Sequence, residues 1–342
     1  MARVDLTVRG AGIFGLSIAW ACAQRGARVR VVDLVGVGAG SSGGIVGALS
    51  PHVPENWNPK KAFQLESLLM AQSWWAAVEA ASGLVSGYGR VGRLQPLADQ
   101  AAVELAQARA LTAAELWQGQ AQWQVVPATG AAWEPASASG FLVRDDLSAR
   151  LHPRLAAAAL VAGLRAAGSE VVQGDVADEG AVVWATGAAG LAALSADLGR
   201  VVGTGVKGQA ALLRFDARDL PQLFVDTLHV VPHVDGTVAI GSTSENRFDD
   251  GTAVDAQVET LIARAQAALP VLAQAEVVER WAGVRPRAAS RAPILGIWPN
   301  RAGHFVANGG FKIGFGMAPK LAEVMADLVL EGRDTIPGDF RF

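Results

Sequence analysis

The sequence predicts an α/β protein with a parallel sheet in one domain and a second, α+β domain built on an antiparallel sheet. Three observations predict this fold. Residues 4–33 run strand, helix and strand, which is the pattern of a parallel β-α-β unit. Residues 206–243 form long alternating strands, with Asp235-Gly236 as a strong two-residue hairpin turn. Residues 304–330 then return to a strand, a Gly-rich loop and a helix.

The further elements follow from apolar periodicity and from the placement of turn residues. Residues 36–47 are dominated by Gly and Ser, so we expect an irregular loop that can approach a ligand closely. We expect helices over 13–24, 59–81, 100–117, 147–167, 252–269 and 314–330, and strands over 4–8, 28–33, 90–97, 123–126, 170–176, 181–185, 228–233, 237–242, 276–284 and 304–308. Parallel-type pieces therefore lie at the start, middle and end of the chain. They predict a discontinuous first domain (1–85, 140–204 and 281–342) and a second domain (86–139 and 205–280).

Composition excludes several classes of protein. With 342 residues, about half of them apolar, the chain can bury one large core or two smaller ones. A net charge of −3 gives no basic field, so we expect neither nucleic acid nor an anionic membrane as a partner. The single cysteine, Cys22, excludes a disulfide framework and a cysteine-based metal site, and we expect no metal. We expect a cytoplasmic protein, because no segment resembles a membrane span or signal peptide; a homo-oligomer stays open.

The chain opens with a nucleotide-binding pattern. Gly10-Ala11-Gly12-Ile13-Phe14-Gly15 fits G-x-G-x-x-G, follows a predicted strand and opens a predicted helix, and Asp33 ends the next strand. Gly10 permits the tight turn, Gly12 lets backbone N–H groups approach a pyrophosphate, and Gly15 lets helix and strand pack closely. The helix N-terminus favours phosphate charge, and Asp33 would accept hydrogen bonds from ribose hydroxyls and repel a 2′-phosphate. A Rossmann-type dinucleotide site is therefore predicted, with NADP disfavoured.

Five separated motifs carry a resemblance to one family. They are the opening glycine motif, the loop Ser41-Ser42-Gly43-Gly44-Ile45-Val46-Gly47-Ala48, Trp184-Ala185-Thr186-Gly187, Trp281-Ala282-Gly283-Val284-Arg285-Pro286 and Asn308-Gly309-Gly310-Phe311-Lys312-Ile313-Gly314. In this order they resemble the FAD-dependent D-amino-acid oxidase superfamily, most closely its glycine oxidase and sarcosine oxidase branch. The resemblance implies that the Rossmann-type domain is an FAD-binding domain of the glutathione-reductase-like kind and that the α+β domain binds substrate.

The resemblance also implies which residues hold FAD. Carried over by position, they are Gly10, Gly12, Ile13, Phe14, Gly15, Asp33, Ser42, Gly43, Gly44, Ile45, Val176, Thr186, Gly187, Gly309, Gly310, Phe311, Lys312 and Ile313. The glycines after Asn308 would bring backbone N–H groups and a helix N-terminus towards the pyrimidine end of the flavin, where reduced flavin is anionic. Some members carry flavin on a cysteine, but Cys22 lies in the nucleotide-binding helix. FAD is therefore expected to be non-covalent.

Three residues are the candidate substrate-binding and catalytic groups. The resemblance places Arg285 where glycine oxidases hold the substrate carboxylate, and a planar guanidinium suits bidentate binding of that group. The alternative is that Arg285 pairs with a nearby acid or carbonyl group. His229 stands where the family commonly has a tyrosine, and a partly buried strand histidine is the alternative. Lys312 stands where glycine oxidase has an arginine, and Ile313 where it has an asparagine; these departures leave the substrate open.

The implied function is FAD-dependent oxidation of a small amino acid or secondary amine of the glycine, sarcosine or D-amino-acid type. Hydride passes to flavin N5, and the resulting imine is hydrolysed. O₂ is the expected acceptor, and a D-amino-acid dehydrogenase using a quinone or another electron carrier is the alternative. A flavin module acting on modified tRNA needs a basic surface, which the net charge does not supply. A flavin-binding sensor and an NAD-linked dehydrogenase are the remaining alternatives.

Overall fold

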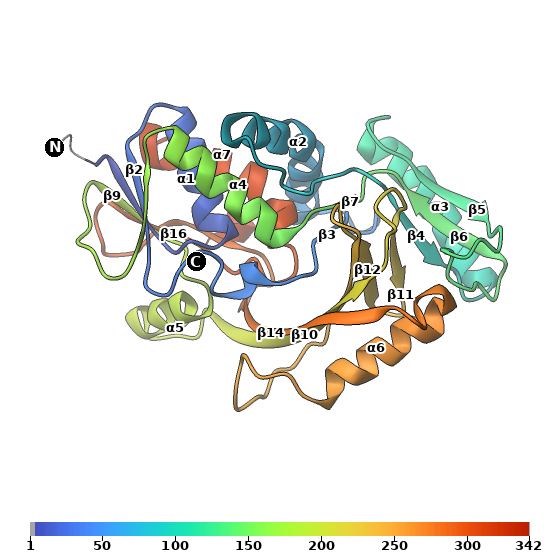
Figure 1. The fold of residues 1–342 in the computed structure, drawn as a ribbon. Coiled ribbons are helices and arrows are strands. Elements are labelled where there is room, and N and C mark those ends of the chain that lie inside the picture. Colours follow the sequence, from blue (N-terminus) through green and yellow to red (C-terminus); the bar gives the residue numbers. More distant parts are fainter. Residues whose placement is uncertain (1–3, 342) are drawn as a thin grey trace.

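The computed structural model describes residues 4–341 and contains two large sheets (Figure 1). The first has six strands in the order β15-β16-β9-β1-β2-β8. All neighbours in it are parallel except β15 and β16, which pair antiparallel at one edge. Its strands are β1 (Leu6–Arg9), β2 (Val29–Asp33), β8 (Glu170–Gln173), β9 (Ala181–Trp184), β15 (Ile294–Ile297) and β16 (His304–Asn308). The predicted parallel sheet is confirmed.

Helices cover the six-stranded sheet. Helix α1 (Ile13–Gln24) is buried from Ile13 to Cys22, because it lies between the sheet and the helices α4 (Pro153–Ala166) and α7 (Gly314–Glu331). A Cβ on Gly163 of α4 would stand 2.9 Å from the Trp20 ring, so α1 and α4 approach closely at that point. Helix α2 (Pro59–Ser82) packs on α4 and α7, and α5 (Gly187–Leu198) lies below them in Figure 1.

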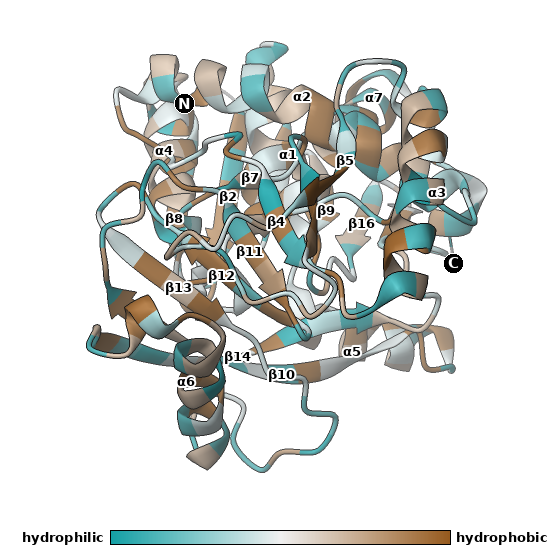
Figure 2. Ribbon diagram, turned by 90° about the vertical axis from the view of Figure 1, so that its right-hand side faces the viewer, coloured by the Kyte–Doolittle hydropathy of each residue, from teal (hydrophilic) through white to brown (hydrophobic). Residues whose placement is uncertain are grey.

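The second sheet has eight strands in the order β14-β10-β13-β12-β11-β4-β6-β5, and only β4 and β11 pair parallel. One face packs on helix α6 (Ala256–Ala268), and apolar residues follow β11, β12 and β13 in Figure 2. The opposite face carries a smaller apolar cluster that includes Ile45. The strands are β4 (Arg93–Pro96), β5 (Trp123–Pro127), β6 (Phe141–Asp145), β10 (Gly203–Arg214), β11 (Gln222–Val225), β12 (Leu228–Pro232), β13 (Thr237–Gly241) and β14 (Glu276–Ala288).

The remaining elements are short or lie at the periphery. Helix α3 (Gln100–Trp117) packs on β5, and a two-stranded sheet joins β3 (Ala48–Leu49) to β7 (Ala149–Arg150). Three single 3₁₀ turns are η1 (Ser41–Gly43), η2 (Pro270–Leu272) and η3 (Gly338–Phe340). The division into two domains at the residues given above stays a prediction, and β6 and the whole of β14 belong to the eight-stranded sheet.

Two predicted helices are wrong at their starts. Helix α6 begins at Ala256, after its capping residue Asp255, and not at 252, and α4 also begins later than predicted. Residues 147–152 are not helical: α4 begins at Pro153, after His152, whose Nδ1 accepts a hydrogen bond from the Leu155 N–H at 3.4 Å. The backbone of Arg150 instead exchanges two hydrogen bonds with Gly89, at 2.9 and 3.0 Å. Tertiary strand pairing therefore overrides the helical composition of this stretch, while Pro suits the first helical position. Strands β6 and β15 and helix α5 are elements that the sequence pattern did not single out.

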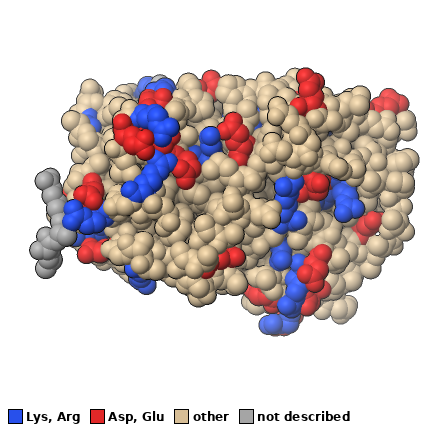
Figure 3. Space-filling model, turned by 90° about the horizontal axis from the view of Figure 1, so that it is seen from above, with Lys and Arg blue, Asp and Glu red and all other residues tan. Residues whose placement is uncertain are grey.

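Acidic and basic residues lie in mixed groups on the face that Figure 3 shows. Within residues 4–341, no helix combines the length and the apolar character that a bilayer crossing demands. The same residues contain no group of three or more His, Cys, Asp or Glu side chains arranged to hold a metal ion.

Candidate active site

The opening glycines make a turn with no room for side chains. Gly10 has a φ of +107°, and a Cβ on it would stand 2.4 Å from the carbonyl oxygen of Ala185. A Cβ on Gly15 would stand 1.9 Å from the carbonyl oxygen of Gly10. Since Ala185 follows β9, the turn after β1 packs directly on the neighbouring strand. The close packing expected of this motif is present.

The N-terminus of α1 suits an anion. Gly12 precedes the helix and supplies no side-chain cap, and the first turn holds no acidic residue. The Ile13 N–H donates to Ser42 Oγ at 2.9 Å, which brings the Ser/Gly loop over the start of the helix. Backbone N–H groups and the helix dipole favour a phosphate at such a place.

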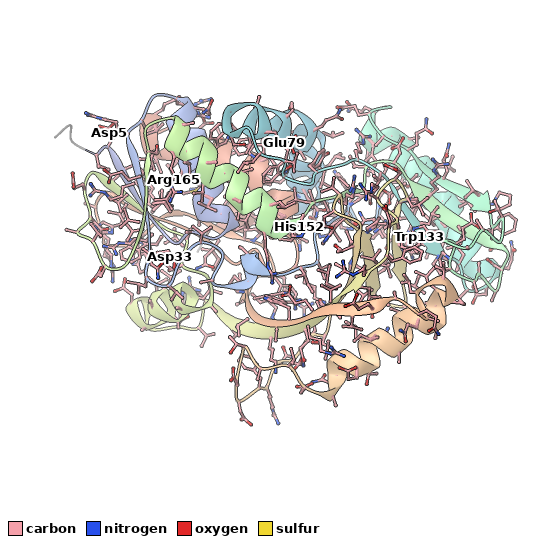
Figure 4. All side chains as sticks on the ribbon, in the orientation of Figure 1. Asp5, Asp33, Glu79, Trp133, His152 and Arg165 are labelled. Carbon is pink, nitrogen blue, oxygen red and sulfur yellow. The ribbon has the colours of Figure 1, made fainter. Side chains whose placement is uncertain are left out.

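Asp33 lies at the end of β2, as expected, and appears in Figure 4 beside the six-stranded sheet. Its Oδ2 accepts the Ala11 N–H at 2.8 Å, and its Oδ1 accepts the N–H groups of Val35 and Gly36 at 3.0 and 2.9 Å. A carboxylate offers about four acceptor positions, so capacity remains for ribose hydroxyls. The Asp33 carbonyl also accepts the Gly174 N–H at 2.9 Å, which places the segment leading to Val176 next to it.

The closing glycines lie against the opening ones. A Cβ on Gly310 would stand 2.7 Å from the Phe14 ring, and one on Gly314 would stand 3.5 Å from Ile13 Cγ2. Asn308 Nδ2 donates to the Gly187 carbonyl at 2.9 Å, which links this segment to the end of β9. Helix α7, like α1, begins without a side-chain cap or an acidic residue in its first turn.

These contacts test whether the residues fit FAD. Segments from the start, middle and end of the chain meet around two uncapped helix N-termini. Glycines stand at positions where a Cβ would collide with neighbouring atoms. The Ser/Gly loop continues towards the eight-stranded sheet, since a Cβ on Gly44 would stand 3.2 Å from the Trp281 ring. The set suits a pyrophosphate at one end and an anionic ring edge at the other, and the residues fit the cofactor. Each residue's contact with FAD stays a prediction, Thr186 and Phe311 included.

Arg285 lies on β14 and is buried, with 8% of its surface exposed. Its Nη1 donates to the Thr243 carbonyl at 3.3 Å. Burial lowers the pKa of Arg285 to about 10, partly offset by the negative charge of Glu245, so the guanidinium stays protonated at neutral pH. The neighbouring Pro286 carbonyl accepts the Phe311 N–H at 2.9 Å, which ties Arg285 to the closing glycine segment. The alternative of an acid in contact with Arg285 is not observed among the described residues, whereas the carbonyl contact is.

Lys312 lies near enough to Arg285 for their positive charges to interact. Its side chain is exposed, yet surrounding protein lowers its pKa by desolvation and, secondarily, through the like charge of Arg285. Its Nζ lies 5.8 Å from the centre of the Phe311 ring. Within residues 4–341 no carboxylate lies within ion-pair distance of this ammonium group. An exposed cation without an acidic partner is suited to bind an anionic ligand.

His229 stands on β12 as a neutral group. Burial lowers its pKa to about 3, and the positive charges of Arg93 and Lys312 add to this effect. Its Nδ1 is buried without a hydrogen-bond partner among the described residues, and its ring lies 4.7 Å from that of Phe224. A histidine with this pKa is unprotonated at neutral pH, so it can exchange hydrogen bonds but cannot supply a positive charge.

Sequence reasoning missed other polar groups near these residues. Arg93 is 6% exposed, and its Nε lies 2.9 Å from Asp145 Oδ2, in a direction that does not suit a hydrogen bond. Thr243 and Gly208 contact the Arg285 guanidinium. Gly208 carried a readable signal, because a glycine inside a strand marks the close approach of another group. Thr243 carried none, because its contribution is a backbone carbonyl.

Comparison with known proteins identifies the family. Residues 5–328 match the family described as DAO, FAD dependent oxidoreductase. A Rhizobium etli protein assigned as the thiamine biosynthesis oxidoreductase ThiO is 31% identical over 95% of this chain and 96% of its own. Glycine oxidase from Bacillus licheniformis is 25% identical over 96% of this chain and 93% of its own.

Solved structures show the same fold. Glycine oxidase from Geobacillus kaustophilus superposes with a TM-score of 0.85 at 24% identity, covering 100% of this chain and 98% of the other. Iminodiacetate oxidase from Chelativorans sp. BNC1 gives a TM-score of 0.84 at 21% identity, covering 98% of each chain. The chain therefore belongs to the DAO family of FAD-dependent amino-acid oxidoreductases, in the branch that contains glycine oxidase and ThiO.

Proposed function

We propose that this protein oxidises a small amino acid or secondary amine, of the glycine, sarcosine or D-amino-acid type, with O₂ as acceptor. The observation that carries the proposal is the buried Arg285 guanidinium. Among the described residues it makes a single hydrogen bond, and it is tied through Pro286 to the closing glycine segment. An unneutralised guanidinium beside a flavin-binding segment is suited to hold a substrate carboxylate and to fix the α-carbon.

The protein's part in the reaction is orientation and electrostatics. Arg285 pairs with the carboxylate, Lys312 adds positive charge near Arg285, and neutral His229 offers Nδ1 as a hydrogen-bonding atom. Bound FAD supplies the acceptor for the hydride that leaves the α-carbon. The oxidised substrate is an imine, which water hydrolyses after release. Cys22 is buried in α1 with a pKa raised to about 12 by desolvation, which supports non-covalent FAD binding.

A peroxide-coupled screen of glycine, sarcosine, proline and D-amino acids tests the activity. Arg285→Ala should raise KM for the active substrate, because losing this contact costs roughly 2–5 kcal/mol of binding free energy. Arg285→Lys should recover part of that loss, since it restores the charge without the planar fork. If Arg285→Ala left KM for a carboxylate substrate unchanged, the assignment of the pocket would fail. If substrate bleached the flavin anaerobically but gave no peroxide with O₂, the acceptor would be another electron carrier.

A second candidate substrate class is an amine with two carboxylates. Arg285 already offers one site for a carboxylate. The observation that favours a second carboxylate is the exposed Lys312 ammonium group, which has no acidic partner among the described residues. Two like charges close to each other are best neutralised by a ligand with two negative charges. Iminodiacetate therefore belongs in the screen beside sarcosine, from which it differs by a second carboxylate. A lower KM for iminodiacetate would support this class, and a higher one would exclude it.

A further inference from the structure

The Arg285 side chain lies flat across the neighbouring strand. Arg285 pairs with Val206 in the register of β14 and β10, and Gly208 pairs with Gly283. A Cβ on Gly208 would stand 1.6 Å from Arg285 Nη1, 2.2 Å from Cζ and 2.3 Å from Nη2. The φ of Gly208 is outside the left-handed region, so its backbone conformation is open to any residue. The reason for glycine at this position is the space that the guanidinium occupies.

The guanidinium reaches a third chain segment beyond β10. Its Nη1 donates to the carbonyl of Thr243, which continues the antiparallel pairing of β13 along β10. The Thr243 N–H donates to the Gln209 carbonyl at 3.1 Å, and the Gln209 N–H donates to Thr243 Oγ1 at 2.8 Å. The carbonyl that receives Arg285 is therefore held by the sheet itself.

Glu245, the acidic residue two positions after Thr243, is held away from the Arg285 guanidinium. Thr243 Oγ1 and Gln209 Nε2 donate to Glu245 Oε1 at 2.5 and 3.1 Å, and Glu245 Oε2 lies 3.7 Å from Lys207 Nζ. Within residues 4–341 no carboxylate lies within 4 Å of the Arg285 nitrogens. The guanidinium is thus held in place by a backbone carbonyl and a glycine, and its positive charge remains available to a ligand.

We propose that Gly208 is a positioning residue for substrate carboxylate binding, because its missing side chain lets Arg285 lie across β10 and reach Thr243. This inference rests on the proposed role of Arg285 in binding the substrate carboxylate. Any side chain at position 208 lifts the guanidinium off the sheet and breaks its contact with the Thr243 carbonyl. A displacement of about 1 Å in such a group is enough to weaken orientation strongly.

The test uses the FAD-loaded enzyme and two small probes, acetate and its neutral analogue acetamide. Binding is followed by the change in flavin absorbance, in wild type, Gly208→Ala, Arg285→Ala and the double variant. We expect Gly208→Ala to weaken acetate binding about tenfold or more and to leave acetamide unchanged. KM for the substrate should rise more than kcat falls. In the Arg285→Ala background, Gly208→Ala should have no further effect, because the two changes act through one contact.

Thr204→Ala, at an exposed position of the same strand, is the matched control and should bind acetate as wild type does. Unchanged acetate binding in Gly208→Ala, or additive effects in the double variant, would overturn the inference. Unchanged acetate binding in Arg285→Ala would instead overturn the proposed function. If Gly208→Ala alone does not retain FAD, its recovery in the double variant supports the contact, and failure to recover contradicts it.

Discussion

Arg9 is a charged residue in the strand that leads into the opening glycine turn. It occupies the last position of β1, where this kind of strand is usually apolar, yet its side chain is only 14% exposed. Its guanidinium binds Asp175 and Asp178 at 3.0 and 2.6 Å and donates to the Val176 carbonyl at 2.6 Å. Arg9 therefore holds the segment 175–178, which leads away from β8 next to Asp33.

Removing this anchor should affect the cofactor more than the substrate. We expect Arg9→Met to weaken FAD binding by about tenfold, since two ion pairs and one charge-assisted hydrogen bond are lost at one partly buried place. KM for the amine should stay as in wild type, because Arg285 and Lys312 come from other elements. Titration of apoprotein with FAD, followed by flavin fluorescence, measures the change. An unaltered FAD affinity would show that segment 175–178 does not contribute to the cofactor site.

At the scale of the element, the sequence could predict those helix bounds that are set by neighbouring residues, and could not predict those set by tertiary contacts. Helices 13–24 and 100–117 have the predicted bounds, because glycines before α1 and the capping Asp99 before α3 set their starts locally. The start of α4 was wrong because pairing between Arg150 and Gly89 is a tertiary contact. A glycine within β10 signals that some group approaches closely, but which group it is depends on the register of β10 against β14, which periodicity does not fix.

The turn between β1 and α1 gives a prediction at the scale of the element. Gly15→Ala should abolish stable FAD binding, because its Cβ would meet the Gly10 carbonyl and push the start of α1 away from the sheet. Gly338→Ala is the matched control, since a Cβ there meets nothing within 4 Å. The ratio of flavin to protein absorbance after purification reports cofactor retention. Equal retention in the two variants would contradict the close packing of this turn.

At the scale of the whole molecule, the candidate site joins the two sheets. Arg285 and His229 come from the eight-stranded sheet, whereas Lys312 follows β16 of the six-stranded sheet. The motifs in sequence order indicated that these segments belong to one family, but only the fold brings residues 14 and 310 into contact. Activity therefore depends on how the two sheets are held together, and conditions that lower the stability of the fold should lower activity as well.

Acid should be such a condition, because half-buried His229 and buried His233 are both neutral in the folded protein. His233 is 1% exposed and is surrounded by His152, Arg150 and Asp235. Burial lowers the pKa of His233 to about 3, and the nearby charge of His152 adds to this effect. The pKa of His229 is lowered to about 3 as well. Unfolded histidine titrates near 6.5, so the unfolded state binds more protons as the pH falls below that value. Stability from these groups is complete above pH 6.5 and is lost progressively towards pH 3. Each histidine should remove about 2–3 kcal/mol of unfolding free energy between pH 7 and 4.5.

His233→Asn isolates one of the two contributions, since asparagine does not titrate. Urea unfolding at pH 7 and at pH 4.5 gives the pH-dependent loss of stability for wild type and for the variant. We expect the loss to be smaller in His233→Asn by the share of one histidine, about 2–3 kcal/mol, whatever the substitution does to stability at pH 7. An identical loss in both proteins would mean that His233 is protonated without unfolding. Its contact with His152, 4.6 Å between ring centres, would then have to open in the folded state.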